Sequence, residues 1–265
     1  MTPVTIITGA SAGIGAELAR VFARNGHTLV LLARRKDKLT ALAAEIAASG
    51  KPEPLVLAID LSLRDAVARI SDALRAHAFE PQYIVNNAGF GLIGPAAELD
   101  RAKQGNMIDL NVRALTDFSL AFVDGLARQQ GGLLNVASVA GFLPGPGMAV
   151  YYASKAYVLS FSQALHQELV SRGVRVTCLC PGPVETEFAS RAGVIEHEAP
   201  AFLTVSAKRV AEAGYRGLMR GQRLVVPGVI NKVMSFLPRI LPRPFLLSAL
   251  AKRQKRRAPS PAPRT

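Results

Sequence analysis

Short apolar segments alternate with longer amphipathic segments along most of the chain. The apolar segments predict strands at Val4–Thr8, Thr28–Leu32, Pro54–Asp60, Tyr83–Asn86, Gly132–Ala137, Val174–Cys180 and Arg223–Val226. Nearly all are unbroken rather than alternating, which is typical of strands that are covered on both faces. Helical periodicity predicts helices near 13–25, 36–49, 63–78, 101–129, 150–172 and 206–219. This alternation predicts an α/β fold, a single doubly wound domain with a mostly parallel seven-stranded sheet.

The pattern changes after residue 228, so we divide the chain into a domain at 1–228 and an extension at 229–265. Residues 229–251 are apolar but are interrupted by three prolines and three basic residues, which makes them a poor membrane span. A basic cluster at 252–257 and a Pro/Ser/Ala-rich end, expected to be disordered, follow. Two interpretations are open: the extension lies in a membrane interface, or it packs over a cleft of its own or a partner subunit.

The charge of the chain is concentrated at this end. The 265 residues carry a formal net charge of +13, but residues 1–212 hold 20 basic and 19 acidic residues, a net of +1. Residues 213–265 hold 12 basic residues and no acidic residue. Aromatic residues make up only 6% of the chain and Trp is absent, so we expect no nucleic-acid partner. Peripheral contact with an anionic membrane through the extension stays open.

Cysteine and histidine give no sign of a metal site or a disulfide. Cys178 and Cys180 lie in an apolar run, where we interpret them as small buried hydrophobic residues. The four histidines have no metal-ligand spacing, so no metal is expected. The N-terminus has no basic segment followed by an apolar stretch, so we expect a cytoplasmic protein without a secretory signal.

A glycine-rich turn directly follows the first predicted strand. The segment Thr8-Gly9-Ala10-Ser11-Ala12-Gly13-Ile14-Gly15 leads into a helix, where glycines let a backbone approach a pyrophosphate. This position in a strand–helix unit predicts a Rossmann-type dinucleotide site. The second strand ends in Arg34 and Arg35, where an NAD site usually carries an acidic residue. Guanidinium groups chelate phosphate, so we expect NADP(H), although these arginines alternatively begin a solvated helix face.

A second constellation combines Tyr151, Lys155 and Ser138. Positions four apart share a helix face, so Tyr151 and Lys155 point into the same cleft. A nearby ammonium favours phenolate, so we expect the pKa of Tyr151 to fall below its usual value of about 10. Such a tyrosine donates a proton to a carbonyl oxygen while hydride arrives at the carbon. Ser138 ends a predicted strand, which is where open α/β sheets bind ligands.

These motifs resemble the short-chain dehydrogenase/reductase family over about residues 4–228. Beyond the turn, the resemblance includes Asp60-Leu61, Asn86-Asn87-Ala88-Gly89, Asn111, Ser138, Tyr151, Lys155 and Pro181-Gly182-Pro183-Val184-Glu185-Thr186. It implies an oxidoreductase with NADP(H) as cofactor. The alternative is a scaffold or regulator that keeps the fold without significant turnover, although a pure binder needs no proton relay.

The resemblance also implies residue roles. Tyr151 is the expected general acid or base, Lys155 binds the nicotinamide ribose, Ser138 binds the substrate oxygen, and Asn111 holds a water in a proton relay. Tyr152 is expected to be a packing residue. The cofactor is expected to contact Gly9, Ser11, Gly13, Ile14, Gly15, Arg34, Arg35, Asp60, Leu61, Asn87, Ala88, Gly89, Tyr151, Lys155, Pro181, Gly182, Val184 and Thr186.

The predicted substrate region is apolar. Residues 185–205 form the expected lid, and Phe90, Leu92, Ile93, Phe142, Leu143 and Met148 are expected to line the cleft below it. This suggests a hydrophobic or lipid-like carbonyl compound, such as a ketone or a 3-oxoacyl compound, or the corresponding alcohol. Alternatively, many of these residues only pack the lid against the body. The family resemblance implies a homodimer or homotetramer built on the helices near 101–129 and 150–172.

Overall fold

Seven parallel strands form one sheet in the order β3-β2-β1-β4-β5-β6-β7, which confirms the predicted fold class. The computed structural model describes residues 1–184, 204–242, 244, 246–248 and 250–252. The strands are β1 Thr2–Thr8, β2 Thr28–Ala33, β3 Leu55–Ala58, β4 Phe79–Asn86, β5 Gly132–Val136, β6 Arg175–Leu179 and β7 Leu224–Val225. Strand β4 begins four residues before the prediction, because Phe79–Pro81 pair with Thr2–Val4 before a shift in register.

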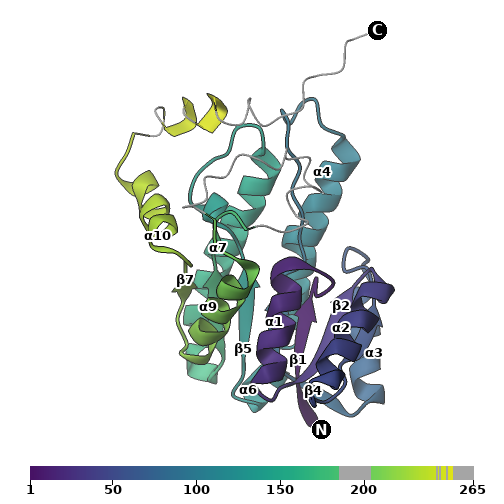
Figure 1. The fold of residues 1–265 in the computed structure, drawn as a ribbon. Coiled ribbons are helices and arrows are strands. Elements are labelled where there is room, and N and C mark those ends of the chain that lie inside the picture. The colour runs from purple at the N-terminus through teal and green to yellow at the C-terminus, as the bar shows by residue number, and fades with distance from the viewer. Residues whose placement is uncertain (185–203, 243, 245, 249, 253–265) are drawn as a thin grey trace.

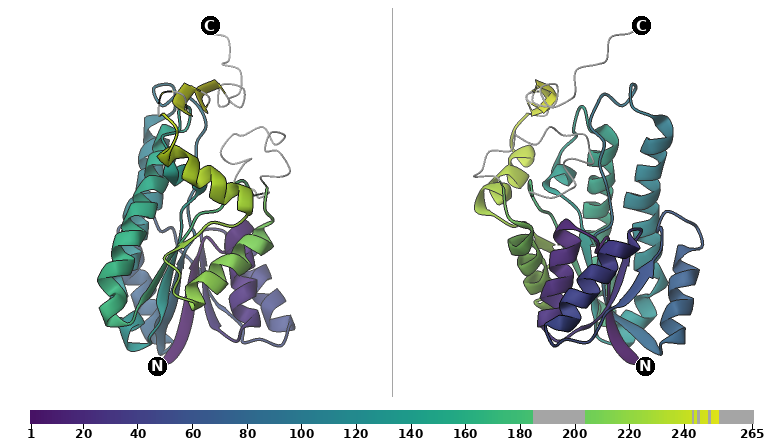
Figure 2. Two further views of the ribbon diagram at one scale, coloured as in Figure 1. Left: turned by 90° about the vertical axis from the view of Figure 1, so that its left-hand side faces the viewer. Right: turned by 45° about the vertical axis from the view of Figure 1, so that its right-hand side comes forward.

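Helices cover both faces of the sheet (Figures 1 and 2). One layer holds α1 (Gly13–Arg24), α2 (Lys36–Ala48) and α9 (Ala207–Met219), and its core includes Phe22, Leu31 and Val210. The other holds α3 (Ala66–Ala76), α5 (Leu115–Ala121), α6 (Val123–Arg128) and α7 (Ala149–Leu169), followed by the short η3 (Val170–Arg172). The strands are buried on both faces because each layer covers one of them, which explains their unbroken apolar sequences.

The helix expected over residues 101–129 is not continuous, so that prediction is wrong in part. Residues 101–128 form α4 (Arg101–Ile108), a π-helical segment η1 (Asp109–Ala114), α5 and, after Phe122, α6. A π-helical turn contains one more residue than an α-helical turn, and such turns are frequent at functional sites. Asn111 lies in this segment with only 1% of its surface exposed. Its hydrogen bonds to the backbone of Phe90, described below, help to hold the altered turn.

The C-terminal extension starts with a helix that packs on the domain. Gly228, with φ of +88°, precedes α10 (Val229–Phe236), and the short η5 (Leu237–Arg239) follows. Helix α10 contacts η2 (Val139–Phe142), which lies between β5 and α7. It lies beyond the carboxyl ends of the strands (Figures 1 and 2). Across the part of the chain that the structure describes, no helix is long and apolar enough to cross a membrane.

Candidate active site

The strand order collects the predicted site residues along one edge of the sheet. From β3 to β6, the carboxyl ends are followed by Asp60, Arg34, the Thr8–Gly15 turn, Asn87, Ser138 and Pro181. Strands β1 and β4 are neighbours although they are far apart in sequence, and this is the point where the strand order reverses. Ligands of open α/β sheets bind outside the strands at such a point.

The glycine turn and the segment after β4 are packed tightly together. A Cβ atom at Gly9, whose φ is +65°, would lie 2.8 Å from Asn87 Nδ2 and 2.9 Å from Ala88 Cα. Thr8 Oγ1 accepts hydrogen bonds from the backbone N–H groups of Asn87 (2.9 Å) and Ala88 (3.0 Å). Asn87 Nδ2 donates to the carbonyl oxygens of Thr8 and Gly9. Only glycine fits at position 9, and the resulting open backbone before α1 suits a pyrophosphate.

The two arginines after β2 reach the turn and the acid after β3. Arg35 Nη2 donates to the backbone oxygen and to Oγ of Ser11, at 3.2 Å each. Arg34 Nη1 lies 3.8 Å from Asp60 Oδ2 and its side chain is 73% exposed. Partial burial acts to raise the pKa of Asp60, but hydrogen bonds from Ser62 and the charge of Arg34 outweigh it, so the pKa is lowered. Arg35 therefore contacts the glycine turn, and Arg34 lies near the acid that follows β3.

Tyr151, Ser138 and Lys155 form the other end of the site. Tyr151 is 9% exposed and Lys155 is 5% exposed. Lys155 Nζ donates to the carbonyl of Val136 at 2.9 Å and lies 5.9 Å from the Tyr151 ring centroid. Burial lowers the pKa of Lys155 to about 8. The ammonium is thus held under the tyrosine ring by the end of β5.

The expectation that Lys155 lowers the pKa of Tyr151 is wrong for this structure. Burial raises the pKa of Tyr151 to about 12, against a smaller lowering by the hydrogen bond with the Ser138 side chain. Desolvation, with a smaller contribution from Tyr152 and Cys180, disfavours the phenolate more strongly than the Ser138 hydrogen bond favours it. The phenol is therefore protonated at neutral pH, which is the state that a general acid requires.

Asn111 is clamped beside this group by its carboxamide. Its Oδ1 accepts from Phe90 N at 3.1 Å, and its Nδ2 donates to Phe90 O at 2.9 Å and to Ser154 Oγ at 3.1 Å. Ser154 Oγ in turn donates to Tyr151 O at 2.7 Å. A Cβ atom at Gly89 would lie 2.9 Å from Asn111 Oδ1 and 3.6 Å from Lys155 Nζ. The structure therefore brings Asn111 and Lys155 to the same side of Gly89.

Apolar residues surround Tyr151. It forms one cluster with the buried Ile93, Met107, Ala140 and Met148 and the partly buried Phe90, Leu92, Val150 and Tyr152. Four of the expected cleft residues, Phe90, Leu92, Ile93 and Met148, belong to it. Phe142 packs instead against the cluster that holds Val158 and the two cysteines. Tyr152 packs against Gly145 and makes an edge contact with the Tyr151 ring, which agrees with a packing role.

The segment after β6 contacts the C-terminal extension. Gly182 lies against the side chain of Asn231 in α10, and Val184 packs on the core beside Val205. The backbone N–H of Val205 donates to Pro183 O at 3.2 Å. Thr186 and nearly all of the expected lid lie outside the described residues, as do Arg253 and the basic residues after it. Nothing in the sequence pattern marked Asn231 except its polarity within an apolar run.

Two further polar groups support the site and were not predicted. Ser154 links Asn111 to the first turn of α7, as described above. Below the site, Asn86 Nδ2 donates to Asn135 Oδ1 at 2.8 Å and to Ser119 Oγ at 2.9 Å, and Asn135 Nδ2 donates to Ser162 Oγ at 3.0 Å. All four residues of this network are at least 97% buried. The signal was an asparagine inside an apolar strand, which requires a buried hydrogen-bond partner.

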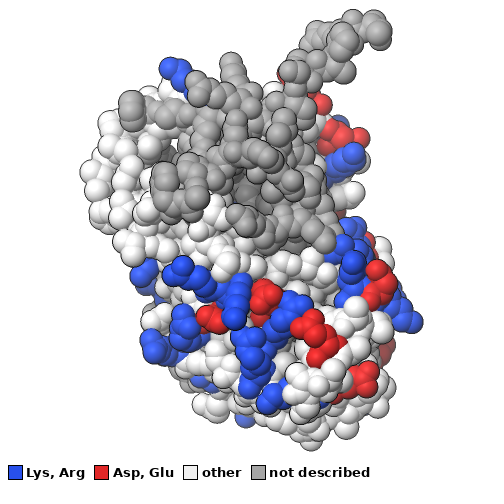
Figure 3. Space-filling view, in the orientation of Figure 1, with Lys and Arg blue, Asp and Glu red and all other residues white. Residues whose placement is uncertain are grey.

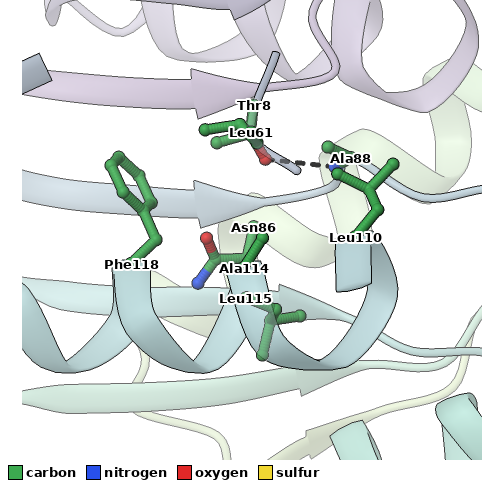
Figure 4. A pocket seen from close by; sticks show the side chains of 8 residues that line it. All are labelled: Thr8, Leu61, Asn86, Ala88, Leu110, Ala114, Leu115 and Phe118. Atoms are coloured by element: carbon green, nitrogen blue, oxygen red, sulfur yellow. Dashed lines mark hydrogen bonds between the residues drawn. The ribbon is translucent and has the colours of Figure 1, made fainter. Parts of the chain in front are cut away.

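A small cavity lies next to the carboxyl ends of β1 and β4 (Figure 4). It is lined by Thr8, Leu61, Asn86, Ala88, Leu110, Ala114, Leu115 and Phe118. Cys178 and Cys180 are buried free thiols with Sγ atoms 3.7 Å apart, as expected for packing residues. The described residues contain no group of three or more His, Cys, Asp or Glu side chains that would hold a metal.

Comparisons with known proteins agree with this geometry. The short chain dehydrogenase family profile matches residues 3–194. Sulfoacetaldehyde reductase 2 of Chromohalobacter salexigens is 39% identical over 191 residues, which cover 71% of this chain and 75% of the relative. The human very-long-chain 3-oxoacyl-CoA reductase is 30% identical over 239 residues, which cover 88% of this chain and 75% of the relative. The structure of a Sphingobium yanoikuyae short-chain dehydrogenase in complex with NADPH superposes with a TM-score of 0.78 at 32% identity. The match covers 91% of this chain and 97% of that protein.

Proposed function

This chain belongs to the short-chain dehydrogenase family, and from that premise we propose that it is an NADP(H)-dependent reductase of hydrophobic carbonyl compounds. As a member of this family it is an oxidoreductase that acts on carbonyl or CH–OH groups with a nicotinamide cofactor. The proposal concerns the form of the cofactor, the class of substrate and the roles of individual residues. In this proposal domain 1–228 carries the chemistry, and the extension 229–265 begins with α10, which packs on the domain.

The proposed mechanism places a substrate carbonyl between Ser138 and Tyr151. A reduced nicotinamide cofactor, when bound, would supply the hydride that the carbonyl carbon receives. Ser138 orients the carbonyl oxygen, and Tyr151 donates its proton to that oxygen. Lys155 holds the ribose of the cofactor and stabilises the phenolate that remains, and Asn111 continues the proton relay toward solvent through a bound water. In alcohol oxidation the same groups act in reverse, with Tyr151 as the base.

The observation that carries this proposal is the geometry of Tyr151, which is buried, hydrogen-bonded to the Ser138 side chain and has Lys155 Nζ 5.9 Å from its ring centroid. The test is NADPH oxidation by the full chain and by Tyr151→Phe, with aliphatic, steroid and 3-oxoacyl carbonyl compounds and with sulfoacetaldehyde. Loss of a general acid lowers the rate by about 10²–10⁴-fold, while NADPH binding, followed by fluorescence titration, stays intact. Undiminished turnover by Tyr151→Phe would refute the assignment. Binding of NADPH without turnover across the panel would favour the scaffold or regulator.

The preference for NADP(H) is supported by Arg34 and Arg35. Arg35 donates to Ser11 in the turn, Arg34 lies 3.8 Å from Asp60, and no acidic residue occupies the end of β2. We expect Arg35→Ala to raise the KM for NADPH and to leave the KM for NADH nearly unchanged. Arg69→Ala, an exposed arginine of α3, serves as the control. A higher kcat/KM with NADH than with NADPH in the wild-type chain would contradict the 2′-phosphate argument.

The hydrophobic substrate is supported by the apolar cluster around Tyr151 and by similarity to the human very-long-chain 3-oxoacyl-CoA reductase. Similarity to a sulfoacetaldehyde reductase favours a small charged aldehyde instead, which is why that compound belongs in the panel. We expect kcat/KM to rise with the apolar length of the substrate. A preference for sulfoacetaldehyde over every ketone would overturn this part of the proposal.

The family also implies a homodimer or homotetramer. Exposed apolar side chains on the relevant helices support such an assembly: Ile108 on α4, Leu120 on α5 and Tyr157 on α7 are 39–51% exposed. Light scattering coupled to size-exclusion chromatography measures the mass directly. A monomer at micromolar concentration would contradict this proposal.

A further inference from the structure

The first part of the C-terminal extension exposes an apolar face. Among the described residues, six of the twelve exposed large hydrophobic side chains lie between positions 229 and 240. They are Val229 (77% exposed), Ile230 (40%), Val233 (54%), Met234 (45%), Phe236 (52%) and Ile240 (67%). Val229, Val233 and Phe236 are spaced by three or four residues within α10, so they share one side of the helix, and Ile240 follows η5. An apolar group of this density is a mark of an interaction surface.

The other side of α10 is fixed to the domain. Asn231 is 3% exposed, and its Nδ2 donates to Pro227 O at 3.0 Å. Its side chain lies against Gly182, and α10 as a whole contacts η2. The exposed side therefore has a defined direction relative to the sheet. Helix α10 itself lies at the end of the molecule where the strands terminate (Figures 1 and 2).

The composition of the C-terminal extension indicates which kind of partner covers the apolar face of α10. Residues 229–265 contain nine Lys or Arg and no Asp or Glu. Lys232, within α10, and Lys252 are both exposed. Basic and acidic side chains are interspersed over the lower body, whereas the surface around α10 is largely uncharged (Figure 3). Apolar side chains next to an acid-free basic segment match the two layers of an anionic bilayer surface, acyl chains and phosphate headgroups.

We propose that α10 and the basic residues that follow it dock the enzyme onto the surface of an anionic lipid bilayer. The apolar face of α10 enters the interface, and the basic residues contact the headgroups. Docking would hold the carboxyl edge of the sheet, with η2 and Gly182, next to the bilayer. The site would then receive its carbonyl substrate from the membrane, and this last step rests on the proposed function.

The experiment is co-sedimentation of the full chain with vesicles of phosphatidylcholine alone or with phosphatidylserine added. Val233→Asp places a charge on the proposed face, and Val170→Asp is the matched control, because Val170 is 55% exposed on η3. We expect binding to the anionic vesicles only, a roughly tenfold weaker partition for Val233→Asp, and wild-type partition for Val170→Asp. Raising NaCl from about 0.05 to about 0.5 M should release the protein.

Three results would overturn the proposal. Equal binding of the wild type and Val233→Asp would show that the basic segment binds anionic surfaces without α10. No vesicle binding by the wild type would exclude docking. A change of oligomeric mass in Val233→Asp without vesicles would identify the face as a contact between copies of the chain. Turnover of a water-soluble ketone, measured without vesicles, tests the proposed function separately, because Val233 has no role in that reaction.

Discussion

Replacement of Gly182 by Ala tests whether α10 is a fixed part of the catalytic domain. A Cβ atom at this position would lie 2.5 Å from both Cγ and Nδ2 of Asn231, whereas ordinary contacts begin at 3.4 Å. Gly182 does not have a positive φ, so alanine brings no backbone strain of its own. The whole effect of Gly182→Ala should therefore come from contact with Asn231.

The size of the effect follows from that geometry. Asn231 has to withdraw by about 1 Å, and it is held by its hydrogen bond to Pro227 O and by burial. Overpacking of this kind costs about 1–3 kcal/mol of unfolding free energy. Each kcal/mol lowers the Tm of a chain of this size by about 2–4 °C. Because Gly182 belongs to the proposed cofactor site, the KM for NADPH should rise as well.

The assay is a double-mutant cycle with Asn231→Ala, which removes the contacting atoms. Asn231→Ala alone loses the hydrogen bond to Pro227 O, which contributes about 1 kcal/mol. In its presence Gly182→Ala should cost almost nothing, which gives a coupling energy of about 1–3 kcal/mol. Gly105→Ala is the control, because a Cβ atom there meets no neighbour within 4 Å. An equal cost of Gly182→Ala with and without Asn231 would refute the packing of α10 against this loop.

Two further predictions concern Lys155 and the buried asparagine network. Because burial lowers the pKa of Lys155 to about 8, kcat/KM for reduction should fall as pH rises through about 8. Any activity of Lys155→Arg should lack this decline, since a guanidinium stays charged. A pH profile of Lys155→Arg identical to that of the wild type would contradict the role of Lys155. Asn135→Ala removes the buried hydrogen bonds that Asn135 makes with Asn86 and Ser162 and should cost about 1–3 kcal/mol in thermal unfolding, whereas the exposed Asn106→Ala should cost almost nothing.

The sequence predicted the fold and most of the proposed cofactor site because these depend on local patterns. Unbroken apolar segments identified the strands, and the glycine turn identified the start of α1. Residues that follow the strands had to meet at one edge, since all the strands are parallel. Arg34 and Arg35 were correctly expected at the end of β2, although their contacts with Asp60 and Ser11 depend on strand order.

The errors and omissions concern properties that depend on neighbours distant in sequence. Asn111, in the π-helical turn, forms hydrogen bonds with Phe90, 21 residues away, and the local sequence does not indicate such a contact. The pKa of Tyr151 is raised because several elements bury the phenol, whereas its spacing from Lys155 suggested the opposite shift. The contact between Asn231 and Gly182 depends on how α10 packs on the domain, 49 residues further along the chain.

The sequence by itself determined the succession of strands and helices along the chain, the glycine turn and the acid-free basic end, because each of these depends on consecutive residues. The tertiary structure alone decided which face of α10 is buried and which is exposed. That choice depends on the shape of the surface formed by Gly182, Pro227 and η2, and the apolar residues of α10 are too numerous for periodicity to select one face. Asn231 is buried against this surface and donates to Pro227 O, as a buried amide requires, whereas Val229, Val233 and Phe236 of the same helix stay exposed.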